Sequence, residues 1–368
     1  MRHSPLCRCV VLIAAIFCGR SVFAVEVGDP AQPAVLPQAI LDAYQAGARE
    51  ITIRPGTYLL PATGKDTILC EQWRDATITA RGCTLIFQEL RQRPVRFHRC
   101  NNVTFRGGTL RFVSHACSQG RIKAIGSNAD GNYVDWQIDA GYPSEFKELG
   151  KTLNLIDQRT RLIKAGTSDI GYKAAETLGP GLYRLQFGKN LPPNIAVNDW
   201  FVTRYSGGAI IVHLDNSENI TVQDVVCQNG GFGTFFETGG SSNHFIGCKV
   251  TFGPKPDGAT EMPLVSCGAD GFHSVNTTIG PEVRDCVFEG VFLDDCIAIH
   301  GTFQAVASVA GNIVTFDGKG DGGFAVGDPV RFSDKNGFFA QARCVDLQRT
   351  GGANRQVRVT LDQDIKVP

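Results

Sequence analysis

The sequence is short of methionine and has no excess of charge of either sign. Its 368 residues include only 2 Met and 3 Trp, and 36 Lys plus Arg balance 36 Asp plus Glu. Proteins that bind nucleic acid electrostatically carry a basic excess, so the balance argues against a nucleic-acid partner. Long helices favour Met, Leu, Ala, Glu and Lys, whereas this chain has 42 Gly and many Val, Ile, Thr and Phe. The composition predicts short strands joined by many turns.

Long apolar runs are also missing, so we expect no membrane span, which needs about 18 apolar residues or more. A short apolar run, Val10–Cys18, follows the basic residues Arg2 and Arg8. Val22-Phe-Ala24 then places small residues at the positions that a signal peptidase reads. These features predict a signal peptide over residues 1–24, cleaved after Ala24, and a secreted or periplasmic mature protein.

The 13 cysteines contain no CxxC pair and no Cys/His cluster with zinc-finger spacing. The sequence therefore predicts no structural metal and no cofactor. Export makes disulfides chemically possible. Several cysteines, however, occupy the same place in similar phrases of the sequence. We interpret them as small buried hydrophobic side chains rather than as disulfides.

A degenerate repeat runs through the chain. Three similar phrases, each following a small polar turn, are Val222–Cys227, Ile246–Thr251 and Val283–Phe288. Their apolar and polar residues alternate as in half-buried strands, and units of this size must stack on their neighbours to bury a face. The pattern predicts an all-β fold, a right-handed parallel β-helix. A β-sandwich is the alternative, but it does not explain why the phrases recur in the same order.

The start of the chain predicts a cap for this β-helix. Residues Leu36–Ala46 form an amphipathic pattern with Ile40, Leu41 and Tyr44 on one face, and Gly47 follows where a helix commonly ends. Exposed solenoid ends need such covers.

Two stretches break the repeat and predict small antiparallel β insertions. The predicted organisation is a signal peptide (1–24), a cap with the first coils (25–127), an insertion (128–206), the coils that carry the site (207–301) and a second insertion (302–368). The chain stops directly after a strand without a closing cap, so we expect further coils beyond Pro368.

Three aspartates carry the candidate chemistry. Asp270 lies in Gly268-Ala-Asp-Gly-Phe-His-Ser274, and Asp294 and Asp295 open the phrase that ends at His300. If the strands that follow are stacked about 4.8 Å apart, Asp270 and Asp295 occupy equivalent positions. Clustered carboxylates cannot all ionise freely, so one pKa rises. A carboxylic acid beside a carboxylate is what glycoside hydrolysis requires. The alternative is that Asp-Gly and Asp-Asp only form turns.

Four further residues are candidate sugar-binding groups. His273 and His300 follow the aspartates, and Glu237 and His213 fall near the same column in the two preceding coils. The alternative for each is a solvated position on a strand surface. The alignment leaves open which side of its strand each side chain occupies.

The aspartate phrases carry a family resemblance. Ala269–Ser274, and Asp294-Asp295 followed by Ile299-His-Gly-Thr302, resemble the signatures of the β-helical α-1,3-galactosidases, glycoside hydrolase family 110. Asp295–Ile299 also resembles the polygalacturonases, family 28. Both families are known as inverting hydrolases that use three aspartates on a pectin-lyase-like β-helix. The resemblance implies that Asp294 is the general acid and that Asp270 and Asp295 hold the nucleophilic water.

The departures favour a neutral sugar. The Gly-His-Gly and Arg-Ile-Lys motifs of polygalacturonases do not follow the aspartates, and Gly268–Gly301 holds one basic residue, Arg284. The implied function is a secreted, inverting, exo-acting α-galactosidase that releases terminal α-1,3-linked galactose from an oligosaccharide or polysaccharide. The alternatives are a polygalacturonase-like pectin hydrolase, a polysaccharide lyase with a basic residue near a Ca²⁺ site, and a non-catalytic carbohydrate-binding surface protein.

Overall fold

A computed structural model describes residues 12–13, 23–62, 64–204, 207–317, 325–349 and 356–366. The described chain is mostly β and divides into two compact units, Met1–Ile299 and His300–Pro368. Most of the predicted signal peptide lies outside the described residues, although Leu12–Ile13 (β1) pairs antiparallel with Ala24–Val27 (β2). In the part of the chain that the structure describes, no helix is long and apolar enough to cross a membrane.

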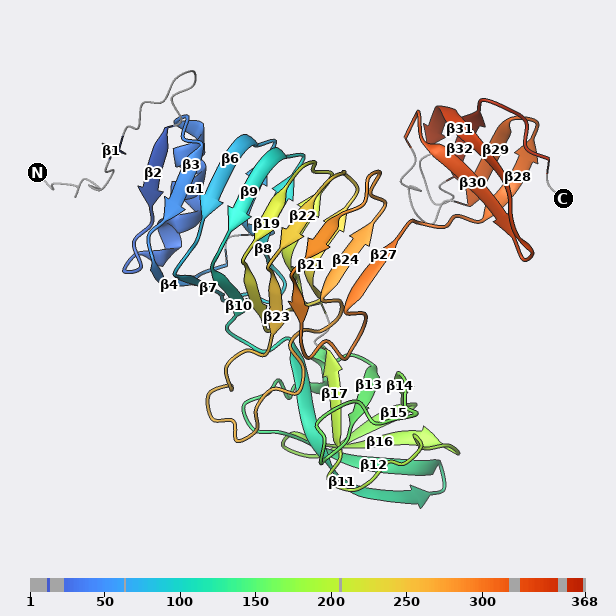
Figure 1. The fold of residues 1–368 in the computed structure, drawn as a ribbon. Coiled ribbons are helices and arrows are strands. Elements are labelled where there is room, and N and C mark those ends of the chain that lie inside the picture. Colours follow the sequence, from blue (N-terminus) through green and yellow to red (C-terminus); the bar gives the residue numbers. More distant parts are fainter. Residues whose placement is uncertain are drawn as a thin grey trace, which may run out of the picture. The chain divides into compact units, whose positions relative to one another are not determined.

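Three parallel sheets make up most of the first unit (Figure 1). The first joins β2, β3 (Glu50–Ile53), β6 (Arg74–Thr79), β9 (Asn101–Arg106), β19 (Thr221–Gln223), β22 (His244–Ile246) and β25 (Glu282–Arg284). The second joins β4 (Gly56–Leu60), β7 (Cys83–Phe87), β10 (Thr109–Phe112), β20 (Val226–Gln228), β23 (Lys249–Thr251) and β26 (Val287–Phe288). The third joins β5 (Asp66–Glu71), β8 (Arg93–His98), β18 (Ile210–Asp215), β21 (Gly233–Thr238), β24 (Phe272–Val275) and β27 (Ile297–His300).

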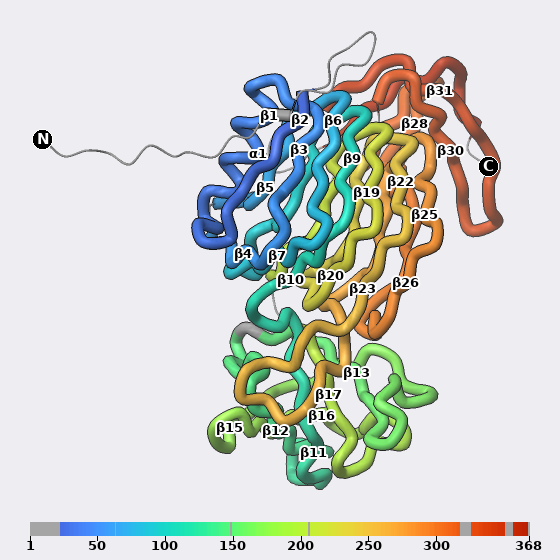
Figure 2. The backbone as a smooth tube through the Cα atoms, turned by 60° about the vertical axis from the view of Figure 1, so that its left-hand side comes forward, coloured from blue at the N-terminus to red at the C-terminus, as the bar shows by residue number. Residues whose placement is uncertain are grey.

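The chain visits these sheets in a fixed order. From β3 to β27 it places one strand in each of the three sheets before it returns to the first. Figure 2 shows β3, β6, β9, β19 and β22 side by side, although they come from distant parts of the sequence. The repeating units of the sequence are therefore neighbours in space.

The register of the repeated phrases differs from the sequence alignment by one residue. Val222 pairs with Phe245, which pairs with Val283, whereas the alignment had placed Ile246 between them. A shift of one residue exchanges the two faces of a strand. The pairing puts the Phe245 ring in the core at 1% exposure, so burial of the larger side chain explains the difference.

The predicted N-terminal helix is present as α1 (Leu36–Gln45), preceded by the short 3-10 turn η1 (Pro33–Val35). Ile40 is buried, and Leu41 and Tyr44 pack against the same core, as the amphipathic pattern predicted. Gly47 lies just past the helix with φ +98°, a conformation that glycine adopts without strain. The sequence was sufficient to predict this helix because one face of α1 is apolar.

Most cysteines of the described residues lie in the core, where we expected small buried side chains. None of the ten cysteines in the described residues forms a disulfide, and eight of them are buried. Cys286 is half-buried, and Cys296 is exposed. Buried thiols here fill the same positions as small apolar side chains.

An antiparallel sheet interrupts the parallel strands of the first unit, and we name Cys117–Arg204 the insertion. Its strand order is β14-β13-β17-β11-β12-β16-β15. The strands are β11 (Cys117–Asn128), β12 (Gly131–Ile138), β13 (Thr152–Ile156), β14 (Ile170–Gly171), β15 (Ala174–Gly179), β16 (Leu182–Gly188) and β17 (Trp200–Arg204), with a 3-10 turn η2 at Phe146–Glu148. The sheet begins at Cys117, before the predicted boundary at residue 128. The sequence did not indicate this start, because the first residues of β11 show no alternation of polar and apolar side chains.

The second unit is an antiparallel sheet with its own core. It contains β28 (Val306–Ala310), β29 (Ile313–Asp317), β30 (Pro329–Asp334), β31 (Gly337–Arg349) and β32 (Gln356–Leu361) in the order β28-β29-β32-β31-β30. Val314, Val359 and Phe332 are among its buried side chains.

Candidate functional site

The structure brings the three aspartates together. The backbone N–H of Gly271 donates to the carbonyl of Asp295 (3.1 Å), and that of Phe272 donates to Cys296 (3.0 Å). This pattern sets Asp270 opposite Asp295 at the start of β24 and β27, with Asp294 beside them. One carboxylate oxygen from each of the three lies within 4.8 Å of the others. Their catalytic roles stay a prediction, which the geometry permits.

Asp270 is the buried and fixed member of this aspartate cluster. It is 5% exposed, and its Oδ2 lies 2.8 Å from Nδ1 of His273. Its Oδ1 accepts a hydrogen bond from the N–H of Asp295 (3.2 Å). The backbone before it is tightly packed, since a Cβ on Gly268 would lie 2.2 Å from the carbonyl oxygen of Gly231. The carboxylate of Asp270 is therefore held in one orientation.

Asp294 is in a different environment. Its side chain is 45% exposed, and its Oδ2 lies 3.9 Å from a guanidinium nitrogen of Arg204. Partial burial raises the pKa of Asp294, the nearby charge of Asp270 raises it further, and Arg204 opposes both effects. A carboxyl group with a raised pKa and access to solvent is suited to donate a proton to a substrate.

His273 is the candidate histidine that reaches the cluster. Besides its contact with Asp270, its ring stacks on Phe236, with centroids 4.1 Å apart and planes 9° apart. Phe236 pairs in register with His273 on one side and with His213 on the other. The three side chains form a column on the outer face of the third sheet, with the imidazole of His273 at the aspartate end.

His213, a predicted sugar-binding residue, is almost fully buried. It is 8% exposed, and Phe236 lies between it and His273 in the column. Its Nε2 lies 3.2 Å from the hydroxyl of Thr238, and burial lowers the pKa of His213 to about 4. It lies in register with Phe236 and His273, and its burial argues against the predicted sugar-binding role.

Glu237 lies inside the first unit and not on its outer face. It is 0% exposed, it accepts hydrogen bonds from the side chains of Ser274 and Asn243, and burial raises the pKa of Glu237. Successive strand residues point to opposite faces, so Phe236 on the outside puts Glu237 within. The sequence had left open which side of the strand Glu237 occupies, and its burial argues against the predicted sugar-binding role.

His300 occupies the last position of β27. Its side chain is exposed, and its Nδ1 lies 3.0 Å from the carbonyl oxygen of Gly301. The division between the two compact units falls directly before it. Its sugar-binding role stays a prediction.

Sequence reasoning missed Arg204 and Phe236. Arg204 ends β17 of the insertion and reaches Asp294 from a part of the chain that carries no repeat. No local motif marks it. Phe236 could have been found, because it lies between His213 and His273 when the strands are aligned in register.

The insertion also anchors the loop that leads to Asp270. Glu261 in this loop forms ion pairs with Arg121 (2.9 Å) and Arg161 (3.3 Å), both from the insertion. The N–H of Leu264 donates to the side chain of Gln119 (2.8 Å). These contacts fix the loop a few residues before Asp270 and so contribute to the position of its carboxylate.

The carboxylate spacing bears on two kinds of chemistry. One oxygen of each carboxyl group lies within 4.8 Å of the others, whereas the roughly 6.5–9.5 Å of inverting glycosidases is a separation between whole carboxyl groups. The expected inversion therefore gains no support from the spacing. Clustered carboxylate oxygens are also ligands that a hard cation such as Ca²⁺ takes.

Comparisons with known proteins add little. No protein-family model matches the chain, and no curated protein sequence matches it. One solved structure that matches in the comparison is described as a "putative glycosyl hydrolase" from Parabacteroides merdae. It shares 10% identity over 73% of this chain and 88% of its own, with a TM-score of 0.28. The resemblance to families 110 and 28 stays a prediction from motifs.

Proposed function

We propose that this protein is a glycoside hydrolase whose catalytic groups are Asp270, Asp294 and Asp295. The observation that carries the proposal is a cluster of three carboxylates in two environments. Asp294 has a raised pKa and is accessible to solvent, whereas Asp270 is buried and fixed. Glycoside hydrolysis needs a carboxylic acid that protonates the leaving oxygen and a carboxylate that activates water.

We assign the roles as follows. Asp294 donates the proton, because it combines exposure with a raised pKa. Asp270 and Asp295 hold the attacking water, since two oxygens within 4.8 Å of each other can both accept hydrogen bonds of about 2.7–2.8 Å from one molecule. His273 orients Asp270. Inversion at the anomeric carbon rests on the family resemblance alone.

The fold that we infer for the first unit is a right-handed parallel β-helix, capped by α1. The support is the ordered return of the chain to three parallel sheets, together with the general right-handedness of connections between parallel strands. Such a fold stacks the starts of β24 and β27, which is what brings the aspartates together.

The proposed substrate is a neutral α-galactoside with a terminal α-1,3 linkage, cleaved outside the cell after removal of residues 1–24. An anionic sugar at this site would meet three carboxylates, and Arg204 already faces Asp294. A neutral sugar avoids this repulsion. The linkage and the exo action come from the resemblance.

A polysaccharide lyase is the second candidate, and Arg204 is the observation that favours it. In such a lyase the clustered carboxylates would hold a cation and a positively charged residue would contact the acidic sugar, and Arg204 lies 3.9 Å from Asp294 of this cluster. Its reaction would depend on added Ca²⁺ and would give an unsaturated product that absorbs in the ultraviolet.

The test is a reducing-sugar assay of the secreted protein on α-galactosides and polygalacturonate, with and without a chelator. We expect chelator-resistant release of sugar that falls by about 10²–10⁴-fold in Asp294→Asn. Asp285→Asn is the matched control, because Asp285 is a 74% exposed aspartate that lies outside the cluster. Chelator-sensitive release of an unsaturated product would show that the protein is a lyase and not a hydrolase. Equal rates in the two variants would remove Asp294 from the chemistry.

A further inference from the structure

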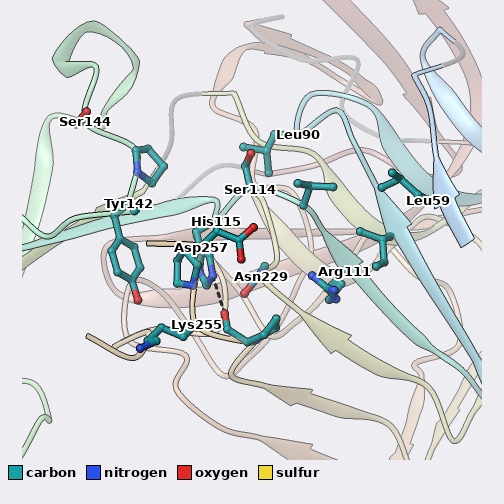
Figure 3. A pocket seen from close by; sticks show the side chains of 16 residues that line it. Leu59, Leu90, Arg111, Ser114, His115, Tyr142, Ser144, Asn229, Lys255 and Asp257 are labelled. Carbon is teal, nitrogen blue, oxygen red and sulfur yellow. Dashed lines mark hydrogen bonds between the residues drawn. The ribbon is translucent and has the colours of Figure 1, made fainter. Parts of the chain in front are cut away.

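A second pocket lies in the first unit and includes none of the three aspartates. Its volume is about 840 Å³, within the roughly 300–1,000 Å³ of small-molecule sites. One wall is the outer face of the second sheet, where Leu59, Ile86 and Arg111 are aligned on adjacent strands. The other walls come from the insertion at Gly141–Ser144 and from the loop at Pro254–Asp257. Figure 3 shows this pocket and its side chains.

Asn229 is the feature of the pocket that calls for a ligand. It is 3% exposed, and neither its Nδ2 nor its Oδ1 has a hydrogen-bond partner among the described residues. A buried amide without partners costs about 1–3 kcal/mol, and buried polar groups are rarely left in that state. Asn229 is one of the residues that line the pocket, so a ligand that reaches its amide would satisfy the donor and the acceptor.

The charged groups of the pocket favour an anion. In the described part of the chain, the side chains of Arg111 and Lys255 form no hydrogen bond or ion pair, and both residues line the pocket. Asp257 is the one carboxylate in the lining and is exposed. Arg111 can bind a planar or tetrahedral anion through two N–H groups.

The neutral groups favour a ligand rich in hydroxyls. His115 is buried, and its Nε2 lies 3.0 Å from the carbonyl oxygen of Pro254, as the dashed line in Figure 3 marks. Burial lowers the pKa of His115 to about 4, so the ring is neutral and its Nδ1 accepts a hydrogen bond. Hydroxyls from Ser114 and Ser144 and the apolar side chain of Leu90 complete a lining that suits the polar edge and apolar face of a sugar.

We propose that this pocket binds a saccharide that carries an anionic group, a carboxylate or a sulfate. Arg111 and Lys255 contact the anion, and Asn229 and His115 contact the hydroxyls. The site shares no residue with the aspartate cluster, so the proposal does not depend on the proposed hydrolysis. It would let the protein hold an acidic glycan while the aspartates face a neutral sugar.

The test is isothermal titration calorimetry with three probes of equal length. These are a chondroitin disaccharide, its sulfated form and neutral N-acetyllactosamine. We expect at least one acidic disaccharide to bind the full chain at least about tenfold more tightly than the neutral one, because charge-assisted hydrogen bonds carry the difference. Binding of both acidic probes assigns the carboxylate, and binding of the sulfated probe alone assigns the sulfate. Equal binding of all three, or of none, would overturn the proposal.

Two variants locate the binding in this pocket. Arg111→Gln should weaken the binding of the acidic probe at least about tenfold. Val113→Trp should abolish binding, because the larger side chain fills the pocket from a position that is 49% exposed. Lys249→Gln, an exposed lysine outside the lining, is the control. Asp294→Asn should bind as the unaltered protein does, which separates this site from the aspartates. Unchanged affinity in both pocket variants would place the ligand elsewhere and contradict the proposal.

Discussion

The backbone N–H of Asp295 donates a hydrogen bond to Oδ1 of Asp270, across two adjacent strands of the third sheet. With His273 on its other oxygen, Asp270 has a fixed partner on each side. Asp294, next to Asp295 in the chain, is instead exposed and faces Arg204 at 3.9 Å. Three carboxylates of one cluster are thus in two different environments, and this difference is what allows them different roles.

Replacement of Arg204 tests the role of Asp294 as the acid. Arg204 lowers the pKa of Asp294 against burial and the charge of Asp270, so Arg204→Gln should raise it further. A general acid works while protonated, and the alkaline limb of the kcat profile should therefore move to higher pH. We expect kcat at the optimum to change by less than about threefold. An alkaline limb that moves to lower pH, or that stays in place, would contradict the assignment.

Asp294→Asn should leave the protein as stable as before or make it more stable at neutral pH. The folded-state pKa of Asp294 is raised, so its favourable contribution is complete below the unfolded-state pKa and is lost as pH rises through the folded-state pKa. Asparagine cannot ionise and avoids this loss. Thermal unfolding at pH 7 and at pH 3 measures this difference in stability. The difference in Tm between Asp294→Asn and the unaltered protein should disappear at pH 3. A lower Tm for the variant at pH 7 would count against the raised pKa.

Phe236 should act as a positioning residue through His273. Its ring supports the imidazole at 4.1 Å, and such stacking contributes about 0.5–1.5 kcal/mol. Phe236→Leu should lower kcat by about two- to tenfold with little change in KM. Phe232→Leu is the matched control, because Phe232 is a 48% exposed phenylalanine whose ring centroid lies 6.4 Å from that of Phe236 and which is outside the column. Equal kcat values for the two variants would show that the stack does not matter for turnover.

Glu237 should matter for stability and not for catalysis. Glu237→Ala removes the acceptor of Ser274 and Asn243 and leaves a cavity, at a cost of about 2–4 kcal/mol in the free energy of unfolding. Urea unfolding measures this cost. The folded variant should keep kcat/KM within about threefold of the unaltered protein. A Glu237→Ala variant with normal stability and no turnover would show that Glu237 acts in catalysis.

The sequence was sufficient wherever a periodic pattern decides the structure. Alternation and recurring phrases predicted short stacked strands, and the spacing of Asp270 and Asp295 placed them on adjacent strands, because parallel pairing repeats at a fixed distance. The helix α1 followed from one apolar face and a terminal glycine.

Sequence reasoning failed where a shift of one residue in strand register, or a contact between distant parts of the chain, determines the position of a side chain. Ile246 was misplaced and the side of Glu237 was left undecided because the side-chain direction alternates at every residue, so an error of one residue exchanges inside and outside. Arg204 was missed because it reaches Asp294 from the insertion. The pocket around Asn229 was missed for the same reason, since its walls come from three separate parts of the chain.

The central claim is that the aspartate cluster hydrolyses a glycosidic bond. A proton NMR time course with an α-1,3-linked galactosyl oligosaccharide tests it most directly, with the unaltered protein and Asp294→Asn side by side. The account predicts that β-galactose appears first with the unaltered protein and that release is slower by about 10²–10⁴-fold in the variant. No release by a folded protein, or equal release by both proteins, would contradict it.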